Sequence, residues 1–388
     1  MSDVHSDCEI VEVEPVVLRA PAEFTPGESW RRGWGETFMV RVHARCGIDG
    51  WGVAETQPDV GRALVEARSQ RSFGESATAT LGGLRELLLG RSAAALGPLW
   101  HALYEGTLVF GRRGAALQAI SAVETACTDL LARRLGVDVA TLLGGRFRDA
   151  VPAYASAVLP EDPREIDALA HYVTDAGYRA AKVGWGAFRT DDATVLALIE
   201  RLRSELPPEI ALAFDVGYEH RRGASETLRL VSALERYEPL WIEEPCHPDD
   251  LDGYRRLAVR ANVPIAAGEA CATAADFAEL IAAGVEILQP DLSRCGGFTV
   301  AREVAALARV AHRRVVPHAW QNGVLLAATL QLCATLPYDT FVETSVAAGP
   351  LRELAMEPLA LAGGAFALPA GPGLGVAPDP DTIERLRA

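Results

Sequence analysis

The most informative segment of the chain is Trp241-Ile-Glu-Glu-Pro245. Two apolar residues run directly into two carboxylates and a proline, which indicates a buried strand that reaches the surface at its carboxyl end. Upstream, the apolar run 211–214 leads into Asp215, and downstream the run 264–268 leads into Glu269. These acids are spaced by roughly 30 residues, the length of one strand–helix unit. Three acids at successive strand ends predict a cation site at the mouth of a barrel.

Length and charge limit what this protein can be. A chain of 388 residues is longer than a single hydrophobic core usually supports, which favours two domains. The formal net charge of −15 argues against nucleic acid or an anionic membrane as a partner. An anionic substrate would therefore need local positive charge from a metal ion or from particular Lys and Arg residues.

Several features predict a cytoplasmic location. No apolar run reaches the roughly 18 residues that a membrane span requires. Residues 1–8 lack the basic and apolar regions of a secretory signal. The seven cysteines are scattered along the chain without a CxxC pair, which is typical of reduced, mostly structural thiols.

The first part of the chain predicts an α+β domain, with strands first and helices after. Residues 20–36 are rich in Gly, Pro and Trp and predict a long loop. From about residue 61 to 134 the pattern is helical, and we assign residues 1–115 to this domain. Alternating apolar and polar residues indicate strands at 9–18, 37–46 and 51–55.

The pattern of apolar and polar residues changes near residue 150. Eight short apolar runs follow, each succeeded by a helical pattern, and this repetition predicts a (β/α)₈ barrel. We assign residues 116–354 to the barrel and expect the tail, residues 355–388, to return to the N-terminal domain. A doubly wound open sheet is the alternative fold, but no GxGxxG motif follows a strand. The predicted strands are 151–156, 180–184, 211–216, 241–245, 264–269, 286–291, 314–318 and 340–344.

In a barrel, the carboxyl ends of all strands face the same mouth, where catalytic groups lie. Seven of the eight predicted strands carry a charged or titratable residue near this end. A single acid in such a position is most often a helix N-cap or a solvated turn residue, and a single histidine is most often structural. The prediction of a site depends on all seven occurring together: Lys182, Asp215, Glu243, Glu269, Asp291, His318 and Glu343.

Three of these carboxylates, Asp215, Glu243 and Glu269, would repel one another unless a cation neutralised them. Oxygen ligands favour Mg²⁺, whereas Zn²⁺ is disfavoured because neither His nor Cys stands at these three strand ends. Asp291 and His318 are expected on neighbouring strands, where the carboxylate would fix the tautomer of the imidazole and raise its basicity. Since no serine or cysteine stands in a G-x-S-x-G turn, we expect His318 to take a proton directly from the substrate.

Longer motifs around these residues point to a known family. The sequence resembles the enolase superfamily and, within it, the mandelate racemase-like group of acid-sugar dehydratases. The motifs are weak separately and specific together, and they extend through nearly the whole chain. They are Gly50-Trp-Gly-Val-Ala-Glu55, Ser121-Ala-Val-Glu-Thr-Ala126, Asp129-Leu-Leu131, Leu142-Leu-Gly-Gly145, Lys182, Asp215, Trp241-Ile-Glu-Glu-Pro245, Gly268-Glu269, Gln289-Pro-Asp291, Gly296-Gly297, Pro317-His318 and Glu343.

The resemblance implies a division of roles among the site residues. Asp215, Glu243 and Glu269 would bind Mg²⁺, which would chelate the carboxylate of the substrate. His318, paired with Asp291, would remove or return the proton at the adjacent carbon. Such a proton is very weakly acidic, so preorganised cationic and hydrogen-bonding groups must offset much of the barrier.

The resemblance also implies roles around that centre. Lys182 and a protonated Glu343 would stabilise the developing charge of the enediolate together with Mg²⁺. The N-terminal domain would cap the mouth, so that the loop 20–36 and the segment Thr56–Asp59 would set specificity. Relatives of this kind assemble, and we therefore expect a homo-oligomer.

Two positions depart from the family pattern. Relatives often carry Lys-x-Lys on the second barrel strand, but this chain has Lys182-Val-Gly184, so the base expected on the other face is missing. Gly217 stands where relatives often have Asn or His. A racemase needs acid/base groups on both faces, whereas a dehydratase needs one base and an acid for the departing hydroxide. The candidates for that acid are His318 itself, Tyr218 and His220, although a position in a surface loop is the preferred interpretation of the last two.

Three further residues near strand ends have other interpretations. Glu244 is expected to support its neighbours through hydrogen bonds rather than to bind a metal. Arg294 either approaches the site or is solvated. Trp185 either lines the pocket or has a purely structural role.

The leading hypothesis is a Mg²⁺-dependent lyase that dehydrates a small sugar acid to a 2-keto-3-deoxy acid. The second is an isomerase that racemises or epimerises a 2-hydroxy acid, and Gly184 argues against it. The third is a metal-binding barrel without catalysis, and the retention of all seven site residues argues against that. A muconate-cycloisomerase-like activity is weaker still, because the lysine pair across the barrel is absent from the sequence.

Overall fold

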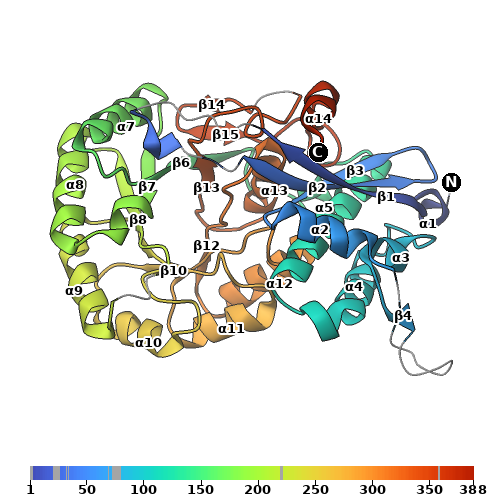
Figure 1. Ribbon diagram of the computed structural model, residues 1–388, viewed down its shortest axis with the longest axis horizontal. Helices are drawn as coiled ribbons and strands as arrows, with labels where there is room; N and C mark the ends of the chain where they lie inside the picture. Colours follow the sequence, from blue (N-terminus) through green and yellow to red (C-terminus); the bar gives the residue numbers. More distant parts are fainter. Residues whose placement is uncertain are drawn as a thin grey trace.

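The computed structural model consists of two parts packed side by side, an N-terminal sheet with its helices and a ring of strands and helices (Figure 1). Among the described residues, no helix combines the length and the apolar character needed to cross a membrane. The homo-oligomer stays a prediction, because one chain is described. The described residues are 3–20, 27–31, 33, 35–68, 70–71, 80–218, 222–356 and 359–388.

Three antiparallel strands form the N-terminal sheet, in the order β1 (Ile10–Arg19), β2 (Glu36–Ala44) and β3 (Asp49–Ala54). Helix α5 (Ala115–Leu135) packs on this sheet and shares a buried hydrophobic cluster with it. The approach is so close that a Cβ atom at Gly52 would lie 1.9 Å from the carbonyl oxygen of Ala122. Glycine in β3 therefore permits the contact between sheet and helix.

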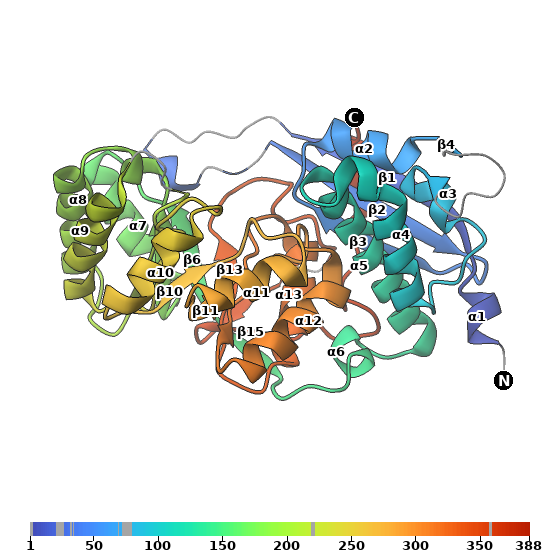
Figure 2. The ribbon, with the colours of Figure 1, turned by 90° about the horizontal axis from the view of Figure 1, so that it is seen from below.

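Shorter elements complete the N-terminal part. Helices α2 and α3 contact the sheet, α4 packs on α5, and Figure 2 gives the view from below. Strands β4 and β5 pair only with each other in the described sheets. The bounds are α1 (Val4–Asp7), η1 (Ser29–Arg31), α2 (Pro58–Glu66), β4 (Gln70–Arg71), β5 (Thr80–Leu81), α3 (Leu84–Leu88), α4 (Leu96–Gly111) and α6 (Val139–Leu142).

The second part is built from eight parallel strands joined by outer helices. The strands are β6 (Ala150–Val158), β7 (Ala180–Gly184), β8 (Ala211–Asp215), β9 (Ile242–Glu243), β10 (Ile265–Ala267), β11 (Ile287–Leu288), β12 (Arg314–Val315) and β13 (Val342–Ser345). The helices are α7 (Pro163–Asp175), η2 (Gly186–Arg189), α8 (Asp192–Glu205), α9 (Ala224–Leu234), η3 (Glu235–Tyr237), α10 (Leu251–Arg260), α11 (Ala274–Ala282), α12 (Gly297–Val310) and α13 (Gly323–Ala334).

The strands lie in sequence order from β6 to β12, and β13 pairs with the free side of β6. On the closing side of the ring, Thr340 Oγ1 donates to the carbonyl oxygen of Val315 at 2.8 Å. This contact joins the segment before β13 to β12. The order is that of a barrel in which each strand from β6 to β12 is followed by an outer helix. The predicted (β/α)₈ barrel with an α+β capping domain is confirmed.

A layer of buried side chains, here called the basal layer, fills the barrel beneath the strand ends. Because residues two positions apart on a strand face the same side, most members stand two positions before a polar residue, as Ala180 does before Lys182. The rings of Tyr154 and Trp241 pack edge to face, with centroids 5.3 Å apart. The basal layer consists of Tyr154, Ala180, Ala213, Trp241, Ala266, Ile287 and Val316.

Several barrel strands are shorter than the sequence predicts. Of the predicted strand 241–245, only Ile242 and Glu243 belong to β9. The ladder ends there because Glu244 has a positive φ of 42° and Pro245 has no N–H to donate. The chain therefore turns away directly after the first acid of the segment.

The C-terminal tail contacts both parts of the molecule. Strands β14 (Leu361–Ala362) and β15 (Ala365–Ala367) form a hairpin, and β15 pairs antiparallel with β6. After α14 (Pro380–Leu386), the backbone N–H of Ala388 donates to the carbonyl oxygen of Val17 in β1 at 3.0 Å. The return to the N-terminal sheet agrees with expectation, whereas the strand added to the barrel sheet was not predicted.

The boundary assigned between residues 115 and 116 stays a prediction. Helix α5 begins at Ala115, and residues 117–131 of this helix share their buried cluster with the N-terminal strands. The same helix also contacts α12 of the barrel. It therefore lies between the two parts and is packed against both.

Candidate active site

All seven residues predicted to form the site lie at the mouth of the barrel, and none is more than 5% exposed. So many charged groups away from water require compensating charges and hydrogen bonds from one another. Four are strand residues and three follow directly after strands. They are Lys182 in β7, Asp215 in β8, Glu243 in β9, Glu269 after β10, Asp291 after β11, His318 after β12 and Glu343 in β13.

The carboxylates of Asp215, Glu243 and Glu269 converge, with their ligand oxygens all within 4.8 Å of one another. Burial and the neighbouring charge of Glu243 raise the pKa of Asp215 well above its usual value. Its Oδ1 is buried and accepts no hydrogen bond from the described residues. An unpartnered oxygen in a cluster of carboxylates fits a hard divalent cation, and three oxygen ligands suit Mg²⁺ better than Zn²⁺.

Hydrogen-bond donors hold each of these three carboxylates. Trp185 Nε1 donates to Asp215 Oδ2 at 3.1 Å, and the hydroxyl of Tyr218 donates to Glu269 Oε1. The remaining carboxylate, Glu243, accepts at Oε2 from the indole of Trp241 at 2.9 Å and from the amide of Gln289 at 2.6 Å. These neutral donors orient the carboxylates without cancelling their charge.

His318 and Asp291 form a hydrogen-bonded pair, with 2.6 Å between Nδ1 and Oδ2. The other oxygen of Asp291 accepts from the backbone and the hydroxyl of Ser293, each at 2.6 Å. The second imidazole nitrogen, Nε2, lies 3.3 Å from Glu269 Oε2 and 3.8 Å from Glu343 Oε2. Asp291 therefore fixes Nδ1 as the protonated nitrogen and turns Nε2 toward the carboxylates.

The surrounding carboxylates control the protonation of this histidine. Burial lowers the pKa of His318, but Glu269 and Glu343 outweigh that effect and raise the pKa to about 10. A cation held by the acidic cluster would offset these negative charges and bring the pKa of His318 back toward neutrality. The histidine and the cluster are therefore electrostatically coupled.

The surroundings of Glu343 favour its ionised form. Its Oε1 lies 2.9 Å from Lys182 Nζ, and its Oε2 accepts from the backbone N–H of Ala319 at 2.8 Å. Burial raises the pKa of Glu343, but Lys182 and His318 outweigh it and lower the pKa to about 2. The resemblance implies a protonated Glu343, and that role stays a prediction, while the ammonium group beside it favours the ionised form.

Arg294 brings a carboxylate from the N-terminal part to the barrel mouth. Its Nη2 lies 2.6 Å from Glu55 Oε1, at the end of β3, and its Nη1 lies 3.3 Å from Glu269 Oε1. Ligand atoms of Glu55, Asp291 and His318 also fall within 4.8 Å of one another, but the guanidinium already supplies positive charge there. Of the two interpretations of Arg294, the structure supports a place at the site.

Steric crowding explains why position 184 holds glycine rather than a second base. A Cβ atom on Gly184 would lie 2.5 Å from the Cβ atom of Asp215, so no side chain fits without a backbone shift. The next residue, Trp185, packs edge to face on Tyr218 with ring centroids 5.5 Å apart. The preferred interpretation of Tyr218 as a surface-loop residue is wrong, because its hydroxyl contacts Glu269. His220, the other proposed acid, lies outside the described residues.

Glu244 has the supporting role that the sequence predicts. Its side chain accepts from the hydroxyl of Tyr254 at 2.5 Å and from the backbone N–H of Gly268 at 2.8 Å. It therefore ties the turn after β9 to the turn after β10, which carries Glu269. No sequence pattern identified Tyr254 as its partner, since the contact depends on how the following helix packs.

A cavity of about 660 Å³ lies between the barrel mouth and the N-terminal part. Tyr218 and Arg294, which both contact Glu269, line one side of it. Thr56, Gln57 and Pro58 line the other side, as expected for a segment that contacts substrate. The loop 20–36, also predicted to set specificity, falls partly outside the described residues. The amides of Gln57, Gln118 and Gln321 line the cavity together with the charged groups of Glu36, Glu55 and Arg294.

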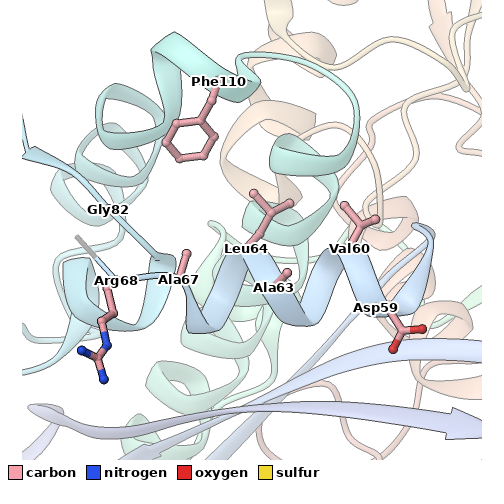
Figure 3. Close-up of a pocket in the computed structure, with 8 residues that line it drawn as sticks. All are labelled: Asp59, Val60, Ala63, Leu64, Ala67, Arg68, Gly82 and Phe110. Atoms are coloured by element: carbon pink, nitrogen blue, oxygen red, sulfur yellow. The ribbon is translucent and has the colours of Figure 1, made fainter. Parts of the chain in front are cut away.

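A second hollow, of about 600 Å³, lies away from the carboxylates and between α2 and α4. Figure 3 shows Val60, Leu64 and Ala67 of the α2 region on one side and Phe110 of α4 on the other. Its lining is mainly apolar, with Asp59 at one end and Arg68 at the other. It contributes none of the predicted site residues.

The fold and the site together define a capped (β/α)₈ barrel enzyme with a carboxylate cluster and a histidine–aspartate pair at its mouth. The chain belongs to the mandelate racemase and muconate lactonizing enzyme family of the enolase superfamily. Residues 14–144 match the model of the mandelate racemase / muconate lactonizing enzyme N-terminal domain. Residues 165–382 match the model described as enolase C-terminal domain-like.

The relatives are named for different enzymatic activities. The D-galactarolactone cycloisomerase of Agrobacterium fabrum is 29% identical over 94% of this chain and 95% of its own length. The D-galactonate dehydratase of Pectobacterium atrosepticum is 32% identical over 76% of this chain and 74% of its own length. A racemase from Streptomyces coelicolor, solved with bound magnesium, is 27% identical with a TM-score of 0.84, over 98% of this chain and all of that chain.

Proposed function

We propose that this protein is a Mg²⁺-dependent dehydratase that converts a sugar acid into a 2-keto-3-deoxy acid. The observation that carries the proposal is the buried His318–Asp291 pair, whose Nε2 faces the cluster of three acids. Position 184, where relatives often carry a second base, holds glycine. One base beside a carboxylate-binding centre suits an elimination, which needs proton removal from one face only.

The reaction begins with transfer of the proton next to the substrate carboxylate to His318 Nε2. Asp291 keeps Nδ1 protonated and stabilises the imidazolium that forms. Lys182, a buried ammonium, stabilises the negative charge that develops on the substrate carboxylate. When bound, Mg²⁺ would supply further positive charge at that carboxylate.

The second half of the reaction breaks the bond to the β-oxygen. The electron pair of the enediolate forms the new carbon–carbon double bond, and hydroxide departs with the proton that His318 has accepted. The resulting enol then loses the proton of its hydroxyl group and takes up a proton at the β-carbon, which gives the 2-keto acid without further change in mass. Water is the only other product, so no oxidant or reductant is required.

The cavity above the site supports a polyhydroxylated substrate. Its three glutamine amides can both donate to and accept from the hydroxyl groups of such a substrate. Its volume of about 660 Å³ lies within the range of small-molecule sites. The dehydratase relative is named for D-galactonate, an acid of this class.

An isomerase is the second candidate function, and one observation from the comparisons favours it. The cycloisomerase relative matches over 95% of its length, compared with 74% for the dehydratase relative. The same proton removal and the same break at a β-oxygen open a ring without loss of water when that oxygen belongs to the ring. Substrate structure would then decide between lyase and isomerase, with unchanged roles for the site residues.

The test is incubation with a panel of sugar acids and their lactones in the presence of Mg²⁺, beside His318→Asn. A 2-keto product lighter than its substrate by one water, lost in the variant, establishes the lyase. A new product of unchanged mass supports the isomerase instead. Deuterium uptake from D₂O at the α-carbon without a new product would indicate racemisation or epimerisation and would overturn the dehydratase.

A further inference from the structure

Two strand ends of the barrel share a local pattern that the proposed reaction does not use. β7 ends in Gly184 followed by Trp185, and shortly after β8 Gly217 is followed by Tyr218. The two strands are neighbours, and Gly184 is in register with Asp215. The pattern therefore places two aromatic rings side by side at the mouth, here called the aromatic pair.

The aromatic pair reaches two of the three clustered acids. The indole N–H of Trp185 donates to Asp215 Oδ2 at 3.1 Å, and the hydroxyl of Tyr218 donates to Glu269 Oε1. In both acids the other oxygen faces the centre of the site. Asp215 Oδ1 accepts no hydrogen bond from the described residues, and Glu269 Oε2 lies 3.3 Å from His318.

The backbone that carries the aromatic pair is held in an unfavourable conformation. Trp185 has φ of 54° and Tyr218 has φ of 56°, a region that side-chain-bearing residues rarely occupy. Such a conformation persists only where surrounding contacts fix it, and it is common at functional sites. The contacts here are the ring packing and a hydrogen bond of 3.1 Å from the N–H of Trp185 to the carbonyl oxygen of Asp215.

Gly217 completes the arrangement by making room for the indole. A Cβ atom at this position would lie 2.9 to 3.2 Å from three atoms of the Trp185 ring. The ring therefore packs directly on the glycine backbone. A tryptophan that only filled space would not need its N–H directed at a carboxylate of the cluster.

We propose that Trp185 and Tyr218 are positioning residues that orient Asp215 and Glu269 and thereby set the affinity of the site for a divalent cation. The inference rests on the metal site of the proposed function, but it does not depend on which reaction follows. Hydrogen bonds to metal-ligating side chains typically contribute 10- to 100-fold in affinity. The aromatic pair supplies such hydrogen bonds to Asp215 and Glu269. It does so from the ends of β7 and β8, where Gly184 occupies the position at which relatives often carry a second base.

The experiment measures the binding of Mn²⁺ to the purified protein without substrate, by calorimetry and electron paramagnetic resonance. Mn²⁺ is suitable because it takes the same oxygen ligands as Mg²⁺. Trp185→Phe and Tyr218→Phe each remove one donor and keep a ring in place. We expect each substitution to weaken Mn²⁺ binding by about 10- to 100-fold.

Tyr237→Phe is the matched control, because it removes a hydroxyl that donates to Glu200 of α8, at 2.8 Å, rather than to a clustered acid. It should leave Mn²⁺ affinity unchanged, and thermal unfolding in EDTA verifies that all three variants fold. Unchanged affinity in both aromatic-pair variants, or an equal loss in the control, would overturn the proposal. So would a wild-type protein that binds no Mn²⁺. Failure of the dehydratase assay alone would not, because no turnover is measured.

Discussion

Among the single residues of the site, Lys182 lies between three carboxylates. Its Nζ contacts Glu243 and lies 2.9 Å from Glu343 Oε1 and 3.9 Å from Asp215 Oδ2. Burial lowers the pKa of Lys182, but Glu243 and Glu343 outweigh it and raise the pKa well above its usual value. The lysine therefore stays charged and compensates acids that would otherwise repel one another.

If an apolar side chain replaces this lysine, the carboxylates around it should repel one another and destabilise the protein. We expect Lys182→Met to destabilise the metal-free protein by about 3–5 kcal/mol, because buried carboxylates lose their counter-charge. Mg²⁺ should recover part of this loss by binding the native state only. Urea unfolding in EDTA and in Mg²⁺ measures both effects. Equal losses in the two conditions would contradict a cation site beside Lys182.

The sequence located the seven site residues in or shortly after barrel strands, but it misjudged Tyr218, whose direction is set by packing. The alternation of β7 and β9 places Lys182 and Glu243 at the mouth, and the strand pattern is visible in the sequence. Tyr218 follows a glycine at φ of 74°, and its direction depends on packing against Trp185. Such non-local contacts leave no periodic signal in a single sequence.

At the scale of elements, the contact between α5 and α12 explains one of the family motifs. Glu124 of α5 accepts from the backbone N–H groups of Phe298 and Thr299, at 2.7 and 2.9 Å, at the start of α12. Ser121, one turn earlier, accepts from the N–H of Gly296 at 2.7 Å. The motif therefore caps a barrel helix from the neighbouring part of the molecule.

This cap should make stability depend on pH. Burial raises the pKa of Glu124 from 4.5 to about 7, although hydrogen bonds from Thr299 and Phe298 oppose the rise. Between these values the native state keeps a proton that the unfolded state releases, so this contribution to stability falls as the pH rises. Below pH 4.5 both states are protonated, and above about 7 both are ionised.

We therefore expect the difference in unfolding free energy between wild type and Glu124→Gln to decrease from pH 5 to pH 8. The slope should reach at most about 1.4 kcal/mol per pH unit. Urea unfolding of both proteins across this range measures it, and pH effects of other groups cancel in the difference. A difference that grows with pH would mean that the carboxylate is ionised in the native state throughout.

Element order was predictable, and element pairing was predictable only in part. Each barrel strand is recognisable in the sequence as an apolar run that ends in a polar residue. The strands lie in the barrel in the same order as in the sequence. The pairing of β15 with β6 has no such signal, because three residues of the tail decide it. The extent of β9 was overestimated since the turn at Glu244 depends on tertiary contacts.

For the whole molecule, the pair of Glu55 and Arg294 connects the N-terminal part to the barrel. We expect Glu55→Gln to cost about 2–3 kcal/mol of stability, because the guanidinium of Arg294, whose side chain is only 16% exposed, loses one of its partners. Glu36→Gln is the matched control, since Glu36 and its partner Arg19 are 45% and 42% exposed. Its cost should stay below about 1 kcal/mol. Denaturant unfolding compares the two, and equal costs would contradict a special role for the buried pair.

The basal layer has a consequence for the order of events in turnover. It closes the barrel below the acids, and the cavity lined by Tyr218 and Arg294 lies on their other side. An ion bound by Asp215, Glu243 and Glu269 must therefore enter through the space that the substrate later fills. On the proposed function, binding would then be ordered, with the cation first and the organic acid second. The acid would cover the ion until product departs, so we expect free chelator to remove the ion from the resting enzyme but not from the enzyme during turnover.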